Sequence, residues 1–140
     1  NFQILGMVVK SISIPIYMNR LHIVFLTDFK SDREKVNTKF NQELEEDHDV
    51  LGLTQQTGRH VFLCINLDKH TRCYKKEEER EIEVLATIVH EVKHIVNFIF
   101  ISNGIKLDLY NDEPECYLLD WIFKEVLKVY LKYKKDGKTI

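Results

Sequence analysis

Four stretches in the first half of the chain have the apolar patterns of β-strands. Phe2–Val9 is a nearly continuous apolar run, and Ser11–Ile16 alternates with a period of two. Because proline has no backbone N–H for the ladder, the alternating stretch is predicted to be an edge strand. After a turn, Leu21–Leu26 predicts a strand that pairs back, and His60–Leu67 has the clearest strand pattern in the chain. Together these stretches predict a small N-terminal sheet.

An amphipathic helix is expected between these strands. Residues 31–34 read Ser-Asp-Arg-Glu, which matches a capping box. Apolar residues then recur at one-turn spacing, at Val36, Phe40 and Leu44. The helix is predicted to end in the acidic segment 45–49. Two polar segments predict a turn and a loop, at residues 55–58 and 68–76.

The second half of the chain predicts two longer helices. Three glutamates at 77–79 favour a helix N-terminus, and Asn103-Gly104 is a common C-terminal stop. Apolar residues between them cover most of the helix circumference, so we expect a buried central helix. The second helix opens with Asn111 or Asp112 as its N-cap and Pro114 in the first turn. Its core-facing residues are predicted to be Leu118, Trp121, Ile122, Val126, Val129 and Tyr133.

These elements predict an α+β fold in which residues 1–140 form one domain. A net charge of −2 gives no reason to expect nucleic acid or an anionic membrane as a partner. The 3 cysteines form no C-x-x-C pair, so we expect no disulfide framework and a reducing cytoplasm. No apolar run approaches the roughly 18 residues of a membrane span.

The centre of the first long helix carries the candidate chemistry, because residues 90–94 read His-Glu-Val-Lys-His. In a helix, His90 and His94 lie one turn apart on the same face, so both imidazoles can bind one metal ion. Glu91 lies beside them, where it can take a proton from metal-bound water. A histidine pair in a buried helix needs polar partners, and a zinc ion would serve both rings. The pattern predicts one Zn²⁺ per chain.

A catalytic zinc ion usually has three protein ligands and leaves its fourth position to water. The chain has no histidine after His94, which argues against the histidine-completed sites of metzincins and SprT-like proteins. A carboxylate from the start of the next helix can fold back onto the motif instead. Glu113 is the first choice, because the helix face that it begins is small and polar, through Cys116, Tyr117 and Asp120. Glu115, whose face is apolar, and Asp112 remain alternatives.

With these residues the chain resembles the gluzincin type of zinc metallopeptidase, in which a glutamate on a second helix completes the H-E-x-x-H site. Its compact form is similar to the minimal metallopeptidase domains of the ImmA/IrrE type and to small phage-encoded H-E-x-x-H proteins. The resemblance spans about residues 58–125 and implies a sheet before the active-site helix. It also implies a glutamate followed three residues on by a small residue, as at Glu113 and Cys116. Thermolysin-like members have an aspartate that orients a zinc-bound histidine, and this chain has Tyr117 at that position. Asp120 or Asp112 could take over the role of that aspartate.

The resemblance implies hydrolysis of a peptide bond. Zinc would polarise the scissile carbonyl and acidify bound water, while Glu91 would take the proton and deliver it to the leaving amine. Tyr117 is the first candidate to donate a hydrogen bond to the oxyanion, and Tyr110 is the second. By the same resemblance, His60–Leu63 is the expected sheet edge along which an extended peptide binds.

The sequence therefore predicts a zinc-dependent metallopeptidase, a hydrolase acting on a peptide or protein substrate. The alternative is a catalytically silent zinc-binding structural or interaction protein, and a third option is hydrolysis of a non-peptide amide. By association with the phage-encoded proteins, we expect the cytoplasm of a phage-infected or prophage-carrying bacterial cell. The oligomeric state stays open. Of the other histidines, His22 and His60 are expected on strand faces, and His48 and His70 in exposed polar segments.

Overall fold

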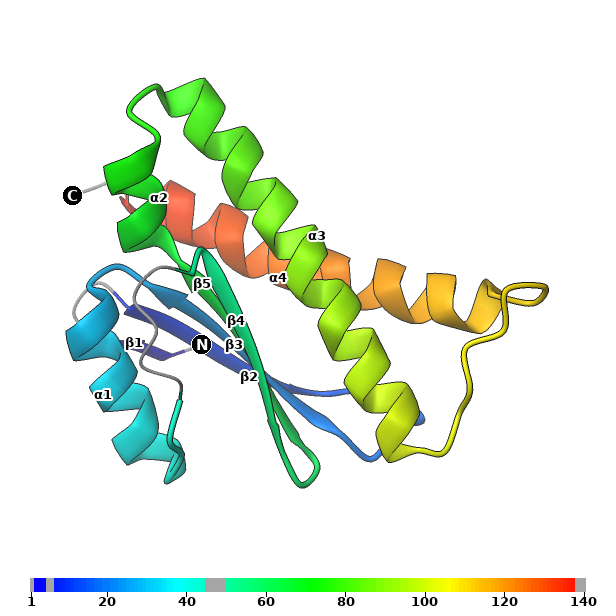
Figure 1. Ribbon diagram of the computed structural model, residues 1–140. Helices are drawn as coiled ribbons and strands as arrows, with labels where there is room; N and C mark the ends of the chain where they lie inside the picture. Colours follow the sequence, from blue (N-terminus) through cyan, green and yellow to red (C-terminus); the bar gives the residue numbers. More distant parts are fainter. Residues whose placement is uncertain (1, 5–6, 45–49, 138–140) are drawn as a thin grey trace.

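A five-stranded sheet with helices packed around it forms the centre of the protein (Figure 1). The computed structural model describes residues 2–4, 7–44 and 50–137. The strands are β1 (Phe2–Ile4), β2 (Met7–Ser13), β3 (Arg20–Leu26), β4 (Gly52–Thr57) and β5 (His60–Asn66). The helices are α1 (Phe29–Phe40), α2 (Leu67–Cys73), α3 (Glu77–Ser102) and α4 (Glu113–Gly137). This arrangement confirms the α+β fold.

The strand order is β1-β2-β3-β5-β4, and hydrophobicity explains which strands are central. β3 and β5 are buried at every position after the first, and strands that are apolar on both faces favour the middle of a sheet. They pair in parallel, whereas the other pairs are antiparallel. The polar strand β4 lies at the edge beside α3. The prediction that His60–Leu63 is a sheet edge is therefore wrong, because β5 lies between β3 and β4.

Two hydrophobic clusters lie on opposite faces of the sheet. The larger one joins α3 and α4 to odd-numbered residues of the central strands, such as Ile23 and Leu63. The smaller one joins α1 to even-numbered residues of the same strands, such as Val24 and Cys64. Because side chains alternate along a strand, α3 and α4 cover one face and α1 covers the other. On the first of these faces α4 crosses α3 (Figure 1).

Several predicted elements are confirmed. The strands expected at Leu21–Leu26 and His60–Leu67 are β3 and β5, although Leu67 already belongs to α2. The first long helix begins at Glu77 and ends before Gly104, whose φ of 68° is the left-handed conformation of a helix stop. The second begins at Glu113 with Pro114 in its first turn.

The N-terminal predictions need correction. The apolar run at the start is divided between β1 and β2, and β2 lies inside the sheet instead of at its edge. Pro15 follows β2 in the connection to β3, so it removes no ladder hydrogen bond and implies no edge.

The predicted capping box of α1 is wrong by three residues. The N-cap is Asp28, whose Oδ1 accepts a hydrogen bond from the backbone N–H of Ser31. Asp32, which is buried, accepts the backbone N–H groups of Thr27 and Asp28, so two acidic side chains fix the chain where it enters the helix. Leu44 lies beyond the helix yet is buried in the smaller cluster. The acidic segment 45–49 lies outside the described residues.

Two polar segments form regular structure that their composition did not predict. Most of the expected turn at 55–58 belongs to β4, and the chain reverses at Gly58, whose φ is 59°. An edge strand exposes much of its surface, so it does not require alternating apolar residues. The expected loop at 68–76 contains α2, because the side chain of Asn66 caps the N–H of Lys69.

Helix α3 is buried on one side only. It is the one helix among the described residues that is long and apolar enough to cross a membrane, with a mean hydropathy of 1.6 over 18 residues. Half of that stretch is buried inside the fold. Core helices of globular proteins pass the same test, so length and hydropathy alone give little support for a membrane span.

Candidate active site

His90 and His94 lie one turn apart on the exposed face of α3. Their Nε2 atoms are 3.1 Å apart. The prediction that the pair is buried is wrong, because α3 turns Ile88, Val92 and Ile95 toward the sheet and leaves the histidine face uncovered. Neither ring needs a partner to offset burial, and both are accessible to an incoming metal ion.

The spacing of the two ring nitrogens suits a shared metal ion. Zinc–nitrogen bonds of about 2.0–2.1 Å in a tetrahedral site separate two nitrogens by about 3.3 Å. The distance between Nε2 of His90 and Nε2 of His94 is 3.1 Å. Without a metal, the same distance allows one neutral imidazole to donate a hydrogen bond to the other. The pair therefore fits zinc as two of its ligands.

Glu91 turns from the same helix toward the edge strand β4 and is only 6% exposed. Thr54 of β4 donates a hydrogen bond from Oγ1 to Glu91 Oε2. Gly52 makes room for this carboxylate, because a Cβ there would lie 2.7 Å from Glu91 Cγ and 2.8 Å from Thr87 Cγ2. Carbon atoms that are not bonded do not approach so closely. The position of Glu91 thus depends on a glycine at residue 52.

Behind Thr87, His70 of α2 is fully buried. Its Nδ1 lies 2.7 Å from the carbonyl oxygen of Asn66, and its Nε2 lies 3.0 Å from Thr87 Oγ1. A carbonyl only accepts, so Nδ1 carries the proton, and in the neutral ring Nε2 competes for the Thr87 hydroxyl proton with the carbonyl oxygen of Glu83, which lies 2.8 Å from Thr87 Oγ1. Burial lowers the pKa of His70 below its usual value, which favours this neutral form. The pair holds α2 against α3 beneath the candidate site.

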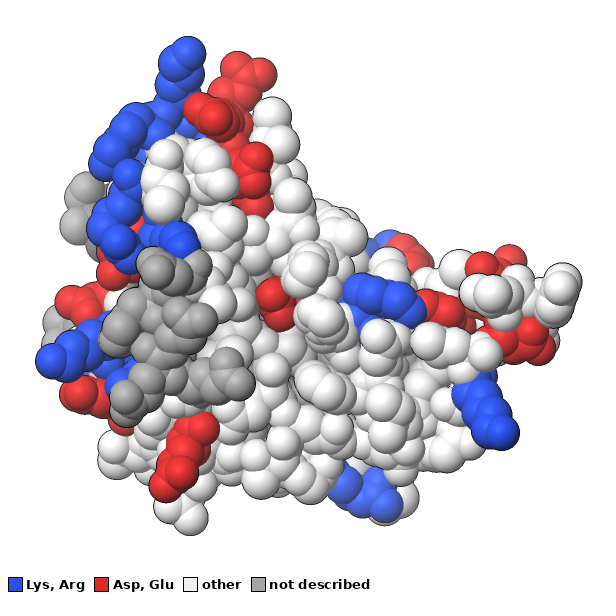
Figure 2. All heavy atoms as spheres, viewed as in Figure 1, with Lys and Arg blue, Asp and Glu red and all other residues white. Residues whose placement is uncertain are grey.

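A cleft of about 570 Å³ opens beside His90 and Glu91. Its walls come from α3, from residues 50–52 at the start of β4, and from Cys73 and Tyr74 at the end of α2. Among the described strands β4 pairs only with β5, so its outer edge keeps unpaired backbone groups. Figure 2 shows charged side chains gathered mainly toward the margins, with few over the middle of α3.

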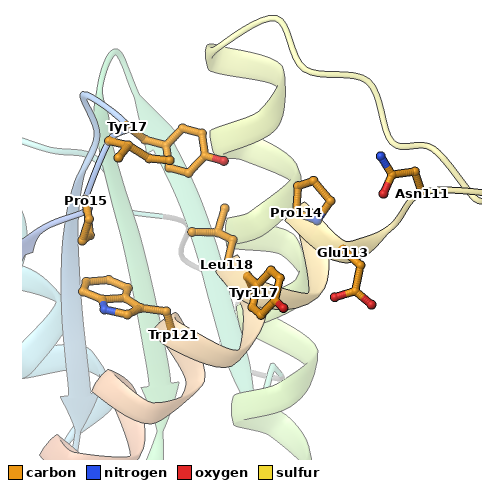
Figure 3. A pocket seen from close by; sticks show the side chains of 9 residues that line it. Pro15, Tyr17, Asn111, Glu113, Pro114, Tyr117, Leu118 and Trp121 are labelled. Atoms are coloured by element: carbon orange, nitrogen blue, oxygen red, sulfur yellow. The ribbon is translucent and has the colours of Figure 1, made fainter.

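Glu113, the first choice for a third ligand, is not brought to the histidine pair. It borders a separate apolar hollow together with Tyr117, and its carboxylate points outward (Figure 3). Across residues 2–4, 7–44 and 50–137, no three His, Cys, Asp or Glu side chains gather closely enough to hold a metal ion. The structure therefore brings His90 and His94 together at the motif but places no third potential metal ligand beside them among the described residues.

Glu115 is the carboxylate of α4 that reaches the motif helix, where it forms an ion pair with Lys93. Lys93 also donates a hydrogen bond of 3.1 Å to Asn97 Oδ1. Glu115 is half-buried on the face of α4 that continues into the buried Leu118. The face of α4 that packs on the core is also the face that meets α3. A polar helix face lies toward solvent, and for that reason Glu113 points away.

The other residues proposed around the third ligand are exposed. Asp112 and Cys116 are accessible, and Asp120 pairs with Lys124 on the surface of α4. Of the two candidate oxyanion donors, neither Tyr117 nor Tyr110 lines the cleft beside His90. The tyrosine that does line this cleft is Tyr74.

A second histidine pair lies on the opposite face of the sheet. His22 Nε2 is 2.9 Å from His60 Nδ1, and His22 Nδ1 is 2.7 Å from Ser11 Oγ. Burial, aided by nearby positive charges, lowers the pKa of His22 to about 4. The prediction that His22 and His60 lie on strands is confirmed. His70 is buried, contrary to expectation, and His48 lies outside the described residues.

Sequence reasoning did not find Gly52, Thr54, His70 or Thr87. Gly52 carries a usable signal, because a glycine within a strand often marks the close approach of another group. The other three have ordinary residue types, and they meet Glu91 or each other only after three separate segments pack together.

No protein-family model, curated protein or solved structure matches this chain. What the site can do therefore follows from its own residues and their geometry.

Proposed function

We propose that the chain is a zinc-dependent metallopeptidase with His90, Glu91 and His94 at its centre. The observation that carries the proposal is the 3.1 Å spacing of the two histidine Nε2 atoms beside a buried carboxylate. Two imidazoles spaced for one tetrahedral ion, with a proton acceptor between them in the sequence of the same helix, are parts that metal-assisted amide hydrolysis requires.

Glu91 is suited to moving a proton during the reaction. Bound zinc would supply the Lewis acid that polarises the scissile carbonyl. Glu91 accepts a proton from the attacking water and passes it to the leaving amine nitrogen. Thr54 donates to Oε2 of this carboxylate, while Oε1 has no hydrogen bond from a described residue. Oε2 is thus held in place, and Oε1, which packs against Gly52, keeps its capacity to accept a hydrogen bond from the water.

The substrate class follows from the surface next to Glu91. The outer edge of β4 offers backbone donors and acceptors to an extended peptide, which can pair with it as an added strand. A peptide lying there passes along the cleft that His90 and Glu91 line. Tyr74 in the same cleft is the first candidate to donate a hydrogen bond to the developing oxyanion.

Glu115 is the first residue to test as the third ligand, because it is the α4 carboxylate that contacts the motif helix. Zinc is measured by elemental mass spectrometry on protein purified without a metal-affinity tag. We expect about one zinc per chain, lost in His90→Ala and reduced in Glu115→Gln, while Glu113→Gln serves as the matched control. Protein that stays free of zinc after incubation with the metal refutes the proposal. Loss of zinc from Glu113→Gln alone reverses the choice of third ligand.

Hydrolysis is tested separately from metal binding with a library of internally quenched peptides. Glu91→Gln keeps the size and hydrogen-bonding shape of the side chain but cannot take a proton. We expect it to retain zinc and to lose at least about 100-fold in cleavage rate. Equal cleavage by the zinc-loaded wild type and by Glu91→Gln rules out Glu91 as the general base.

A second candidate function is a zinc-binding interaction protein without turnover. The ion pair of Lys93 with Glu115 favours it, because the structure commits that carboxylate to a partner other than a metal. In that case zinc raises the melting temperature of the wild type and of Glu91→Gln equally. The protein then cleaves no member of the peptide library. It also cleaves no member of a panel of small amides, which tests for hydrolysis of a non-peptide amide.

A further inference from the structure

The hollow that Glu113 borders lies between the β2–β3 connection and the first turns of α4 (Figure 3). Its volume is about 510 Å³, and we call it the aromatic hollow after its walls, Pro15, Tyr17, Pro114, Tyr117, Leu118 and Trp121. Tyr117 is 71% exposed, and Ile16 at the same hollow is 93% exposed. Large apolar side chains exposed around a concave surface are typical of a binding site.

The lining of the aromatic hollow is almost wholly apolar, and the polar groups around it belong to Trp121, Tyr17, Tyr117, Asn111 and Glu113. Trp121 Nε1 can only donate, and the hydroxyls of Tyr17 and Tyr117 can donate. None of the three has a hydrogen-bond partner among the described residues. A ligand complementary to this surface is largely apolar and offers acceptors to these three groups, while any donor that it brings has to face Glu113 or Asn111.

A proline-rich segment in the polyproline II conformation has this chemistry. Proline has a carbonyl but no N–H, and the polyproline II helix makes no internal hydrogen bonds, so its carbonyls are free to accept. With three residues per turn, prolines spaced as in Pro-x-x-Pro lie on one face and can pack against flat aromatic rings. An α-helix satisfies most of its carbonyls internally and matches the donors less well.

The charges beside the hollow further limit which ligand can bind there. Glu113 and the preceding Asp112 are exposed, and neither forms an ion pair with another described residue. Their carboxylates favour a ligand that carries Lys or Arg and disfavour an anionic membrane surface. A second copy of this chain offers no proline-rich segment, because its 2 prolines, Pro15 and Pro114, are both in the walls of the hollow.

We propose that the aromatic hollow binds a proline-rich segment of a partner protein, with an Arg or Lys of that segment next to Glu113. The prolines pack between Tyr17, Tyr117 and Trp121, and the partner's carbonyls accept from their side-chain donors. This site is separate from the histidine pair and does not depend on metal.

The chain provides its own reporter, because Trp121 is its only tryptophan. The full chain is titrated with an acetylated, amidated ten-residue peptide that has one Pro-x-x-Pro step and two flanking arginines but no aromatic residue. We expect a saturable change in tryptophan emission. A peptide with alanines in place of the prolines should give none, and one with glutamates in place of the arginines should bind about fivefold more weakly at low salt.

Variants locate the binding surface. Tyr117→Ala, at an exposed position, should weaken binding of the arginine peptide about tenfold. Glu113→Gln should weaken it about threefold and leave the glutamate peptide unaffected. Tyr110→Ala is the matched control, because Tyr110 is fully exposed and outside the hollow, and it should bind normally.

Three results overturn the proposal, provided that circular dichroism shows folded protein. The first is no saturable response to the proline peptide. The second is equal binding of the alanine peptide, which would indicate a helical ligand. The third is concentration-dependent dimerisation that Tyr117→Ala abolishes, which would indicate a second copy of the chain.

Discussion

The first turns of α4 separate two regions with opposite chemistry. On one side Glu115 meets Lys93 of the motif helix, and on the other Glu113 borders the aromatic hollow. The motif site, which comprises His90, Glu91 and His94 with their β4 neighbours, is polar and closely packed at its carboxylate. The aromatic hollow is open and apolar.

The two regions differ in whether their polar side chains already have hydrogen-bond partners in the protein. In the motif site a buried carboxylate has a donor in Thr54 and a glycine that makes room for it, so its position is fixed before any ligand arrives. In the aromatic hollow the side-chain donors have no partner among the described residues. A fixed polar group suits chemistry, whereas unsatisfied donors on an exposed apolar surface suit recognition. Changes to the first region should therefore affect folding, and changes to the second should affect binding.

The largest effect is expected from Gly52→Ala. The new methyl group would lie under 3 Å from side-chain atoms of both Glu91 and Thr87, which the packed helix cannot easily move. We expect a loss of about 2–3 kcal/mol in the free energy of unfolding, measured by urea denaturation. Gly58→Ala is the control, because nothing lies within 4 Å of a Cβ there and only the positive φ opposes it, at about 1 kcal/mol. Equal losses in the two variants would mean that Gly52 makes no special room for Glu91.

Thr54→Val should have the next largest effect. Valine has nearly the same shape as threonine but cannot donate to Glu91, so a buried carboxylate loses its hydrogen bond. Hydrogen bonds to charged groups contribute about 1.5–3 kcal/mol, and we expect a loss of about 2 kcal/mol in urea denaturation. Thr54→Ser keeps the donor and should lose less than half as much. If Thr54→Val is as stable as the wild type, the motif carboxylate does not depend on β4.

The sequence predicts elements whose signal is local. The strands at Leu21–Leu26 and His60–Leu67 and the helix from Glu77 follow from hydrophobic patterns within each segment, and burial in the core enforces those patterns. Strand β4 has no such pattern, because an edge strand is held by pairing with β5 and by contact with α3. Its place in the sheet comes from residues elsewhere in the chain.

The same limit applies to the candidate site. The spacing of His90 and His94 is a property of one helix and could be predicted, whereas which of Glu113 and Glu115 contacts α3 depends on which side of α4 packs against it. The polar face of a helix lies toward solvent, so it does not identify the residues that meet a neighbouring helix. The aromatic hollow combines Pro15 and Tyr17 with residues 111–121, and no local pattern joins segments about 100 residues apart.

Acid should lower the stability of the fold without affecting the aromatic hollow. Burial lowers the pKa of His22 to about 4 and also lowers that of His70, whereas an unfolded histidine titrates near about 6.5. Below that pH the unfolded chain binds protons that the native chain does not, so stability falls as the pH drops from about 6.5 toward 4. We expect a loss of about 1–2 kcal/mol between pH 7.5 and 5, measured by urea denaturation.

His22→Gln should remove part of this pH dependence. Peptide binding at the aromatic hollow should stay unchanged over the same range while the protein remains folded, because no histidine lines it. A stability that is constant from pH 7.5 to 5 would show that the two buried rings accept protons in place.

The smallest effect is expected at Ile16, and its sign is opposite to the others. Ile16 has a φ of 59°, a left-handed conformation that costs a β-branched residue about 1–2 kcal/mol, and its exposed side chain makes little compensating contact. Ile16→Gly removes this strain but adds entropy to the unfolded chain. We expect a net gain of about 0.5–1 kcal/mol, seen as a melting temperature higher by about 2–4 °C. Ile16→Ala retains the strain and should not reproduce the gain.

Because Ile16 borders the aromatic hollow, Ile16→Gly should also weaken binding of the proline peptide, as expected where strain is retained for recognition. A variant that gains stability and binds as well as the wild type would separate the strain from recognition.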